Sequence, residues 1–188
     1  MNVSSDRALT DGCTPPRRKR RAAKELLSSL ALLPVIWASA TMGADPGKAV
    51  FRPLPAATAG HMDRQRAYVA SLLQKHFPGT KITRTRADFA TLQRIVDAKL
   101  IPADRTWEWQ SMGIVFGDAL AGAIPGLQWY EVTDAYGTDP TLRYRSTSLQ
   151  INAMTMISKR IEDGDEVDVA HLAAWLADFI KNKAHEYQ

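Results

Sequence analysis

The chain has 188 residues, with 24 basic and 20 acidic side chains and a net charge of +4 at pH 7. Residues 1–44 hold seven of the basic and three of the acidic residues, so residues 45–188 are left with 17 of each. A protein that binds nucleic acid needs a surplus of Lys and Arg on one surface, where it replaces the counterions of the phosphates. The balanced charge after residue 44 therefore excludes nucleic acid as a partner.

The first 44 residues predict an export signal peptide. A basic cluster at residues 17–21 precedes an apolar segment at residues 26–37, and small residues follow, which is the order of a secretory signal. The apolar run is roughly a dozen residues long, whereas a helix that crosses a bilayer needs about 20, which disfavours an uncleaved membrane anchor. We therefore expect cleavage after Ala40 or Ala44, a periplasmic protein and no stable membrane insertion after cleavage.

Removal of this segment also removes Cys13, the only cysteine of the chain. No thiol then remains for a disulfide, a catalytic nucleophile or a metal ligand. The sequence predicts a flexible spacer at residues 45–60, which are rich in Pro, Ala and Gly. Residues 61–188 are then expected to form a single domain.

Apolar residues at helical spacing predict three helices at the start of this domain. The first begins near Met62 and ends before Pro78, with His76 on its apolar face. The second begins with a capping-box sequence at Thr85, and the third follows a cap at Asp104.

The third helix carries a small residue at every fourth position, at Gly113, Gly117 and Ala121. In a membrane such a pattern favours helix dimerisation, but Glu108 and Asp118 interrupt the apolar sequence. Glycine costs about 1 kcal/mol relative to alanine inside a helix, so a packing reason is needed for two of them. We therefore expect this helix to pack closely against a neighbouring helix or sheet.

The second half of the domain predicts a small antiparallel meander of two or three strands followed by two helices. Residues 127–132 are β-prone, residues 134–140 are dense in turn-forming residues, and apolar residues alternate again from Leu142. Gly164 is expected to end one helix and Asp168 to cap the last. The order ααα-ββ(β)-αα predicts an α+β fold, with helices packed on a small antiparallel sheet.

No recognised catalytic motif or phosphate-binding glycine loop is present in the sequence. The four histidines are more typical of packing or surface positions than of bases or ligands. The acidic run at residues 162–168 does not fit a calcium-binding loop, because Asp168 and Ala174 occupy the positions that require Gly and Glu. We therefore predict no catalytic residue, no metal site and no cofactor.

The segment from Asp134 to Pro140 is the most specific candidate site. Its residues fit a tight loop in which Asp134 accepts backbone hydrogen bonds and Gly137 takes a positive φ. They also fit a polar binding site, or a salt-bridge lattice of modest energy. In these two arrangements three polar residues face a basic set: Asp134, Tyr136 and Asp139 against Arg143, Arg145, Lys159 and Arg160.

Four aromatic residues gather near the predicted junction of helix and sheet. Trp109 is expected in the core, as is Trp129 at a β-prone position. Trp107 and Tyr130 fall on less apolar faces and are candidate anchors for a partner, although core packing is the alternative for each.

Three separate segments carry a family resemblance. They are Trp109-Gln110 with Gly113 and Phe116-Gly117, then Trp129 with Asp134-x-Tyr136-Gly137-x-Asp139-Pro140-x-Leu142-Arg143, and finally Thr155-x-Ile157-Ser158-Lys159-Arg160-x-Glu162. Together they resemble a bacterial domain-of-unknown-function family, number 3806, over residues 85–175. The resemblance implies one domain and brings no established activity, cofactor or catalytic residue.

Three hypotheses of function follow. The first is an exported, non-enzymatic protein with a protein partner, such as an immunity-type inhibitor of a toxin that acts in the envelope. The second is a module that binds a small molecule or a cell-wall fragment, in a pocket lined by Trp107, Tyr130, Tyr136 and Arg143. The third, which is the least favoured, is a hydrolase that uses two carboxylates, either Asp134 with Asp139 or Glu108 with Asp118.

Overall fold

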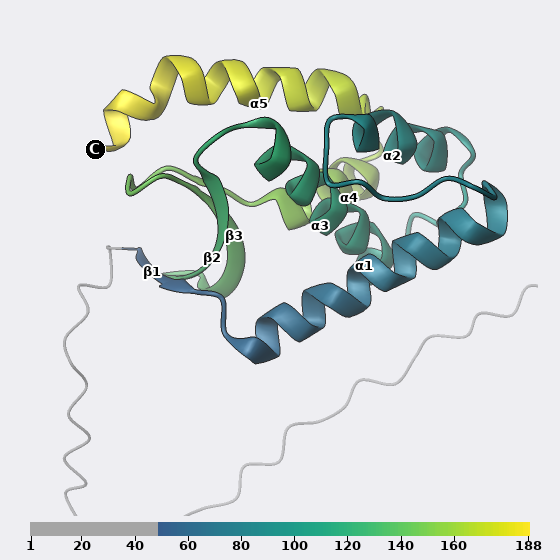
Figure 1. Cartoon of the computed structure of the whole chain (residues 1–188), viewed down its shortest axis with the longest axis horizontal. Coiled ribbons are helices and arrows are strands. Elements are labelled where there is room, and N and C mark those ends of the chain that lie inside the picture. The colour runs from purple at the N-terminus through teal and green to yellow at the C-terminus, as the bar shows by residue number, and fades with distance from the viewer. Residues whose placement is uncertain (1–48) are drawn as a thin grey trace, which may run out of the picture. The chain divides into compact units, whose positions relative to one another are not determined.

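The computed structural model describes residues 49–188, and the predicted signal peptide at residues 1–44 lies outside this part. Within it the predicted α+β class is confirmed: five α-helices pack with a four-stranded antiparallel sheet (Figure 1). The elements in chain order are β1 (Val50–Pro53), α1 (Ala56–His76), α2 (Ala87–Asp97), α3 (Thr106–Ala123), β2 (Leu127–Asp134), β3 (Gly137–Tyr144), β4 (Gln150–Ile151), α4 (Ala153–Asp163), α5 (Val169–Lys183) and the 3-10 helix η1 (Ala184–Tyr187).

The strands follow the order β1-β2-β3-β4, and every neighbouring pair is antiparallel. The predicted meander corresponds to β2, β3 and β4. A fourth strand, β1, comes from the segment predicted as a spacer, and α1 begins directly after it at Ala56. The prediction of a flexible segment at residues 45–60 is therefore wrong for residues 50–60. Proline suits the end of an edge strand and the start of a helix, which are the places of Pro53 and Pro55.

The connection between β2 and β3 is shorter than predicted. Only Ala135 and Tyr136 lie outside the strands, because Asp134 pairs with Gly137. Pro140 therefore lies within β3 rather than in a loop. Strand β4 pairs only with Leu142 and Arg143, so within the described residues the opposite edge of β3 is unpaired beside Pro140. A missing amide costs no ladder hydrogen bond at such an edge.

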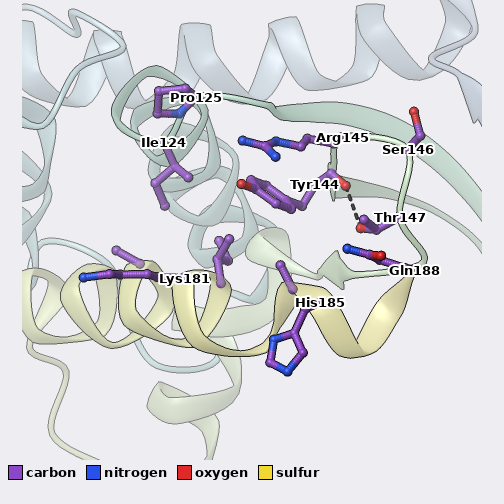
Figure 2. A pocket seen from close by; sticks show the side chains of 12 residues that line it. Ile124, Pro125, Tyr144, Arg145, Ser146, Thr147, Lys181, His185 and Gln188 are labelled. Carbon is purple, nitrogen blue, oxygen red and sulfur yellow. Dashed lines mark hydrogen bonds between the residues drawn. The ribbon is translucent and has the colours of Figure 1, made fainter.

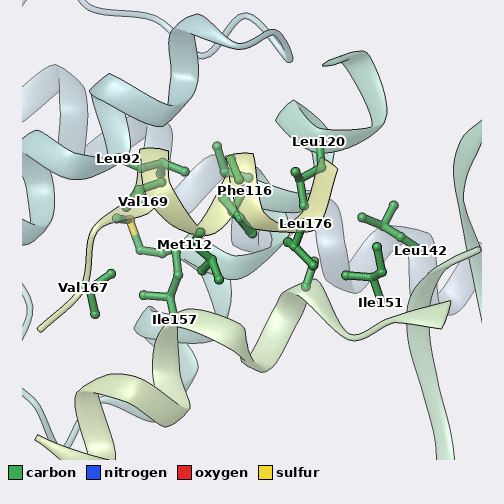
Figure 3. Close-up of a cluster of buried hydrophobic side chains, with 14 of the residues drawn as sticks. Leu92, Met112, Phe116, Leu120, Leu142, Ile151, Ile157, Val167, Val169 and Leu176 are labelled. Carbon is green, nitrogen blue, oxygen red and sulfur yellow. The ribbon is translucent and has the colours of Figure 1, made fainter. Parts of the chain in front are cut away.

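Helix α3 lies at the centre of the domain and contacts α1, α2, α4 and β2. Trp109 and every residue from Ser111 to Leu120 are buried. A helix that is apolar on all sides is stable only when other elements surround it. Figure 3 shows Met112, Phe116 and Leu120 of this helix among side chains contributed by α2, α4, α5 and the sheet.

The predicted close packing of the small residues of α3 is confirmed. A Cβ atom at Gly113 would overlap the carbonyl oxygen of Met154 in α4, and one at Gly117 would overlap the ring of Trp129 in β2. The two glycines therefore let one helix and one strand approach the backbone of α3.

Several predicted helix ends are confirmed. Gly164 ends α4 with a φ of +76°, and the Asp168 carboxylate accepts a hydrogen bond from the backbone N–H of His171 at 2.8 Å. Two predictions are wrong. Asp104 does not cap α3, because the backbone N–H of Arg105 closes a turn on the carbonyl of Pro102 first. His76 is exposed, because Phe77 takes the inward position at the end of α1.

None of the helices in residues 49–188 combines the length and the hydropathy that a membrane crossing requires.

We predict that Gly113→Ala lowers the free energy of unfolding by about 1–3 kcal/mol, because the added methyl group must push α4 away from α3. Gly60→Ala is the matched control, since no atom lies within 4 Å of a Cβ at that helical position. It should raise the free energy of unfolding by about 0.5–1 kcal/mol. Urea denaturation of both variants measures this difference, and equal stabilities would contradict it.

Candidate functional site

The tip of the β2–β3 hairpin presents an aromatic side chain to solvent. Tyr136 is 97% exposed, and its backbone N–H donates to the Asp134 carboxylate at 2.8 Å. This local hydrogen bond is the one expected of an aspartate in a turn. The positive φ that the turn needs falls on Gly137, at +138°, as the sequence predicted. The backbone beneath Tyr136 is therefore fixed although the ring touches little of the domain.

A pocket of about 480 Å³ lies beside the tip of this hairpin, and we call it the hairpin pocket. Three parts of the chain form its wall: β2 and β3, the first half of α3, and the segment from Asn152 to Lys159 at the start of α4. Most of the lining residues come from the three segments on which the family resemblance rests. They are Gln110, Asp134, Tyr136, Gly137, Asp139, Pro140, Thr155 and Lys159.

The structure brings together four of the eight predicted site residues. Asp134, Tyr136, Asp139 and Lys159 all line the hairpin pocket. Among the described residues, the carboxylates of Asp134 and Asp139 form no ion pair within 4.0 Å. The salt-bridge lattice that was an alternative is therefore not formed, and these charges stay available to a partner.

The remaining predicted residues lie elsewhere. The Arg143 guanidinium is 4.3 Å from the centre of the Phe51 ring and 5.5 Å from that of Tyr130. It also donates to two backbone carbonyls, those of residues 147 and 146, at 2.7 and 2.8 Å. Arg143 and Tyr130 thus hold the edge of the sheet to the β3–β4 turn. The contacts of the Arg143 guanidinium with the Phe51 and Tyr130 rings are cation–π interactions that stabilise the sheet.

Arg160 and Trp107 also make contacts within the domain. Arg160 donates to the backbone carbonyl of Met156 at 2.8 Å within α4. The Trp107 ring, 38% exposed, meets the Tyr68 ring edge-on with 5.3 Å between centroids. Burial raises the pKa of the Tyr68 hydroxyl, and the negative charge of Glu108 adds to this rise. Because Trp107, Tyr130 and Arg143 do not reach the hairpin pocket, the structure does not form the four-residue binding pocket predicted from the sequence.

Asp118, which the sequence analysis considered as a catalytic carboxylate together with Glu108, is a buried charge on α3. Its carboxylate accepts two hydrogen bonds from the Arg66 guanidinium, at 2.6 and 2.8 Å, and one from the indole N–H of Trp129 at 2.9 Å. The hydrogen bond to Asp118 raises the pKa of Arg66, against the opposing effect of burial. These donors satisfy the Asp118 carboxylate and balance its charge, which argues against Asp118 as an acid or base.

Residues 49–188 contain no group of three or more His, Cys, Asp or Glu side chains arranged to hold a metal ion.

The site lies inside the part of the chain that has known relatives. Residues 88–172 match the family model described as Domain of unknown function (DUF3806). The resemblance predicted from the sequence is thereby confirmed. Every residue that lines the hairpin pocket falls within this match, whereas β1, α1 and the second half of α5 lie outside it.

A solved structure shares the fold. It is a crystal structure from Bacteroides thetaiotaomicron VPI-5482 at 1.50 Å resolution, with a TM-score of 0.63 and 18% sequence identity. The match covers 69% of this chain and 47% of that chain, so this chain spans about half the length of that protein. At this identity the likeness describes the fold alone. No curated protein matches the chain.

We predict that Asp118→Asn lowers the free energy of unfolding by about 2–3 kcal/mol, because it leaves the partly buried Arg66 guanidinium without its main counter-charge. Asp63→Asn is the matched control, since the exposed Asp63 carboxylate pairs with the same guanidinium at 2.9 Å. Its cost should stay below about 1 kcal/mol. Urea denaturation of the two variants tests this. Similar losses of unfolding free energy would show that burial does not determine the energy of the ion pair.

Proposed function

We propose that the protein is a non-enzymatic binding protein of the bacterial periplasm, which holds a protein partner through the tip of the β2–β3 hairpin. The observation that supports this most directly is Tyr136. Its ring is 97% exposed on a backbone that Asp134 and Gly137 fix, and nothing in the domain's own packing requires it. Exposed tyrosines on rigid supports are typical anchors of protein interfaces, because burying them costs little conformational entropy.

The charges around Tyr136 extend this proposal. Asp139 and Lys159 are exposed beside the hairpin pocket, and the partly exposed Asp134 lies at its rim. An aromatic anchor surrounded by polar groups of both signs matches the usual arrangement of an interface, in which polar groups surround an apolar centre. The hairpin is then the element that enters a cleft of the partner.

One concrete form of this proposal is an immunity-type inhibitor. A hairpin that carries a tyrosine at its tip and acidic groups beside it is suited to block the cleft of a toxin delivered to the envelope. The periplasmic location rests on the signal peptide predicted at residues 1–44, outside the described residues.

A photo-crosslinking amino acid in place of Tyr136 tests the binding surface in living cells. We expect Tyr136→p-benzoylphenylalanine to give one discrete cross-linked protein in envelope extracts. The same replacement at Trp175, which is 51% exposed on α5, is the control for a solvent-exposed aromatic position and should not give that product. Identical products at the two positions would contradict a specific hairpin site.

The partner recovered in this way allows an affinity measurement. We expect Tyr136→Ala to weaken binding about 30-fold or more, which corresponds to the loss of about 2 kcal/mol at an anchor residue. Because the ring is exposed, the free energy of unfolding should change by less than about 0.5 kcal/mol. Unchanged affinity in calorimetry would remove the proposed anchor.

The immunity form of the proposal further requires that production of the partner alone arrests cell growth and that co-production of this chain restores growth.

The hairpin pocket itself supports a second candidate, the binding of a small molecule or a cell-wall fragment. Its volume of about 480 Å³ falls in the range of ligand sites, which is about 300–1,000 Å³. Asp139 and Lys159 offer acceptors and a cation to a zwitterionic fragment. Calorimetry with muropeptides separates the two candidates: binding that is lost in Lys159→Ala and kept in Tyr136→Ala would favour the small ligand.

A further inference from the structure

A larger groove lies outside the hairpin pocket, along the C-terminal helices. It has a volume of about 860 Å³ and is lined by the α3–β2 connection, the β3–β4 connection, the second half of α5 and η1 (Figure 2). Ile124, Ile180 and Ala184 give it an apolar wall. The part of α5 and η1 that contributes to it, from Ala177 onwards, lies beyond the matched segment at residues 88–172. The groove shares no lining residue with the hairpin pocket, so it is separate from the site of the function proposed above.

A second cavity of about 310 Å³ shares Ile124 and Ala177 with the first. Its wall is again mainly apolar, with Phe89 and Leu120 from α2 and α3, and Arg86 and Asp178 are its charged lining residues. The two cavities meet at these shared residues, and we call their apolar lining beside α5 the apolar path.

Two cations line the larger cavity. Arg145 and Lys181 line the 860 Å³ cavity, and no Asp or Glu side chain does. Within the described residues neither cation forms an ion pair. In Figure 2 the Arg145 guanidinium and the Tyr144 hydroxyl point in the same direction, whereas the His185 ring turns away from the groove.

The Arg145 side chain is held in place although it is exposed. Its guanidinium lies 4.9 Å from the centre of the Tyr144 ring, and a Cβ at Gly126 would come within 2.9 Å of its Cγ. The stem therefore lies against Gly126 while the guanidinium lies over the ring. Arg145 also has a φ of +51°, a left-handed conformation that is unfavourable for arginine. A glycine would adopt this backbone at no cost, so the backbone conformation itself does not favour an arginine.

We propose that the groove binds a free fatty acid, with the carboxylate at Arg145 and the chain along the apolar path beside α5. A guanidinium recognises a carboxylate through two parallel hydrogen bonds, and Lys181 contributes a second positive charge to the lining of the groove. An inorganic anion would leave the apolar path unused, and a flat membrane surface would not enter it.

Calorimetry of the full chain with dodecanoate, below the concentration at which it forms micelles, tests this proposal. We expect saturable binding with one site. Octanoate should bind at least tenfold more weakly, because each methylene removed from the apolar path weakens binding up to about fourfold. Dodecyltrimethylammonium, which has the same chain and the opposite charge, should not bind. Absence of dodecanoate binding, or equal binding of the cationic amphiphile, would overturn the proposal.

Arg145→Gly is the decisive variant. It removes the charge and relieves the unfavourable backbone conformation, so the melting temperature should not fall. Dodecanoate affinity should fall at least tenfold through the loss of the charge-assisted hydrogen bonds. Lys99→Gly is the matched control, since Lys99 is also a basic residue at a positive φ, +49°, and does not line the groove. It should bind dodecanoate like the unaltered chain, and equal affinities of the two variants would refute the site.

Ala177→Phe tests the apolar path separately. Ala177 lines both cavities, so a larger side chain there should block the chain of the ligand while leaving Arg145 in place. We expect dodecanoate to lose at least tenfold in affinity, with octanoate less affected. If dodecanoate binding persists in this variant, or if the chain associates only with anionic vesicles and not with monomeric dodecanoate, the fatty acid does not lie in this groove.

Discussion

The close approach of other elements to the backbone of α3 is the constraint on which the rest of the structure depends. Gly113 lets the start of α4 lie directly on α3, and Gly117 does the same for the Trp129 ring of β2. These two contacts set the distance between the β2–β3 hairpin and the first turns of α4. The hairpin pocket is lined by the same three elements, so its width follows from the two glycines rather than from the residues that line it.

A second interaction fixes the orientation of α1 and β2 relative to α3. The Asp118 carboxylate on α3 is bound to Arg66 of α1 and to Trp129 of β2, and Arg84 of the α1–α2 connection lies 3.8 Å away. Apolar packing tolerates small rotations of a helix, whereas a carboxylate with directional partners does not. The one charge in the buried part of α3 therefore fixes the register of α1 and β2 on the helix, at the level where Gly117 brings β2 nearest.

Local signals in the sequence were enough to predict the helices and the hairpin, whereas long-range pairing was not visible in it. Helical periodicity and caps such as Asp168 and Gly164 depend on neighbours a few residues away. Strand β1 has four residues and acquires its identity only by pairing with β2, about 80 residues later in the chain. The same holds for Asp118, whose partner Arg66 is 52 residues away. Its position in an apolar helix was the one signal that it needed a buried counter-charge.

Local sequence signals also predicted one part of the candidate site and not the other. Asp134, Tyr136 and Asp139 were predicted together because they belong to one hairpin, and Lys159 joins them because α4 is held against α3. Arg143 and Arg160 are as near in sequence, but backbone carbonyls close to them take up their hydrogen bonds. A composition-based argument counts all four basic residues as equal. Only the local geometry shows which of them remain free to meet a partner.

Among residues 49–188 the three non-glycine residues at positive φ are all basic, and their surroundings differ. Arg84 lies 3.8 Å from the Asp118 carboxylate. Lys99 follows the C-terminus of α2, where a positive charge interacts favourably with the helix dipole. Arg145 has no such partner, and its guanidinium lies over a tyrosine ring at the end of an apolar groove. A left-handed arginine costs about 1–2 kcal/mol relative to an ordinary conformation. The contact with the Tyr144 ring and the hydrogen bond from the Arg145 N–H to the Gly126 carbonyl offset part of that cost, and the carboxylate proposed above would add a further interaction.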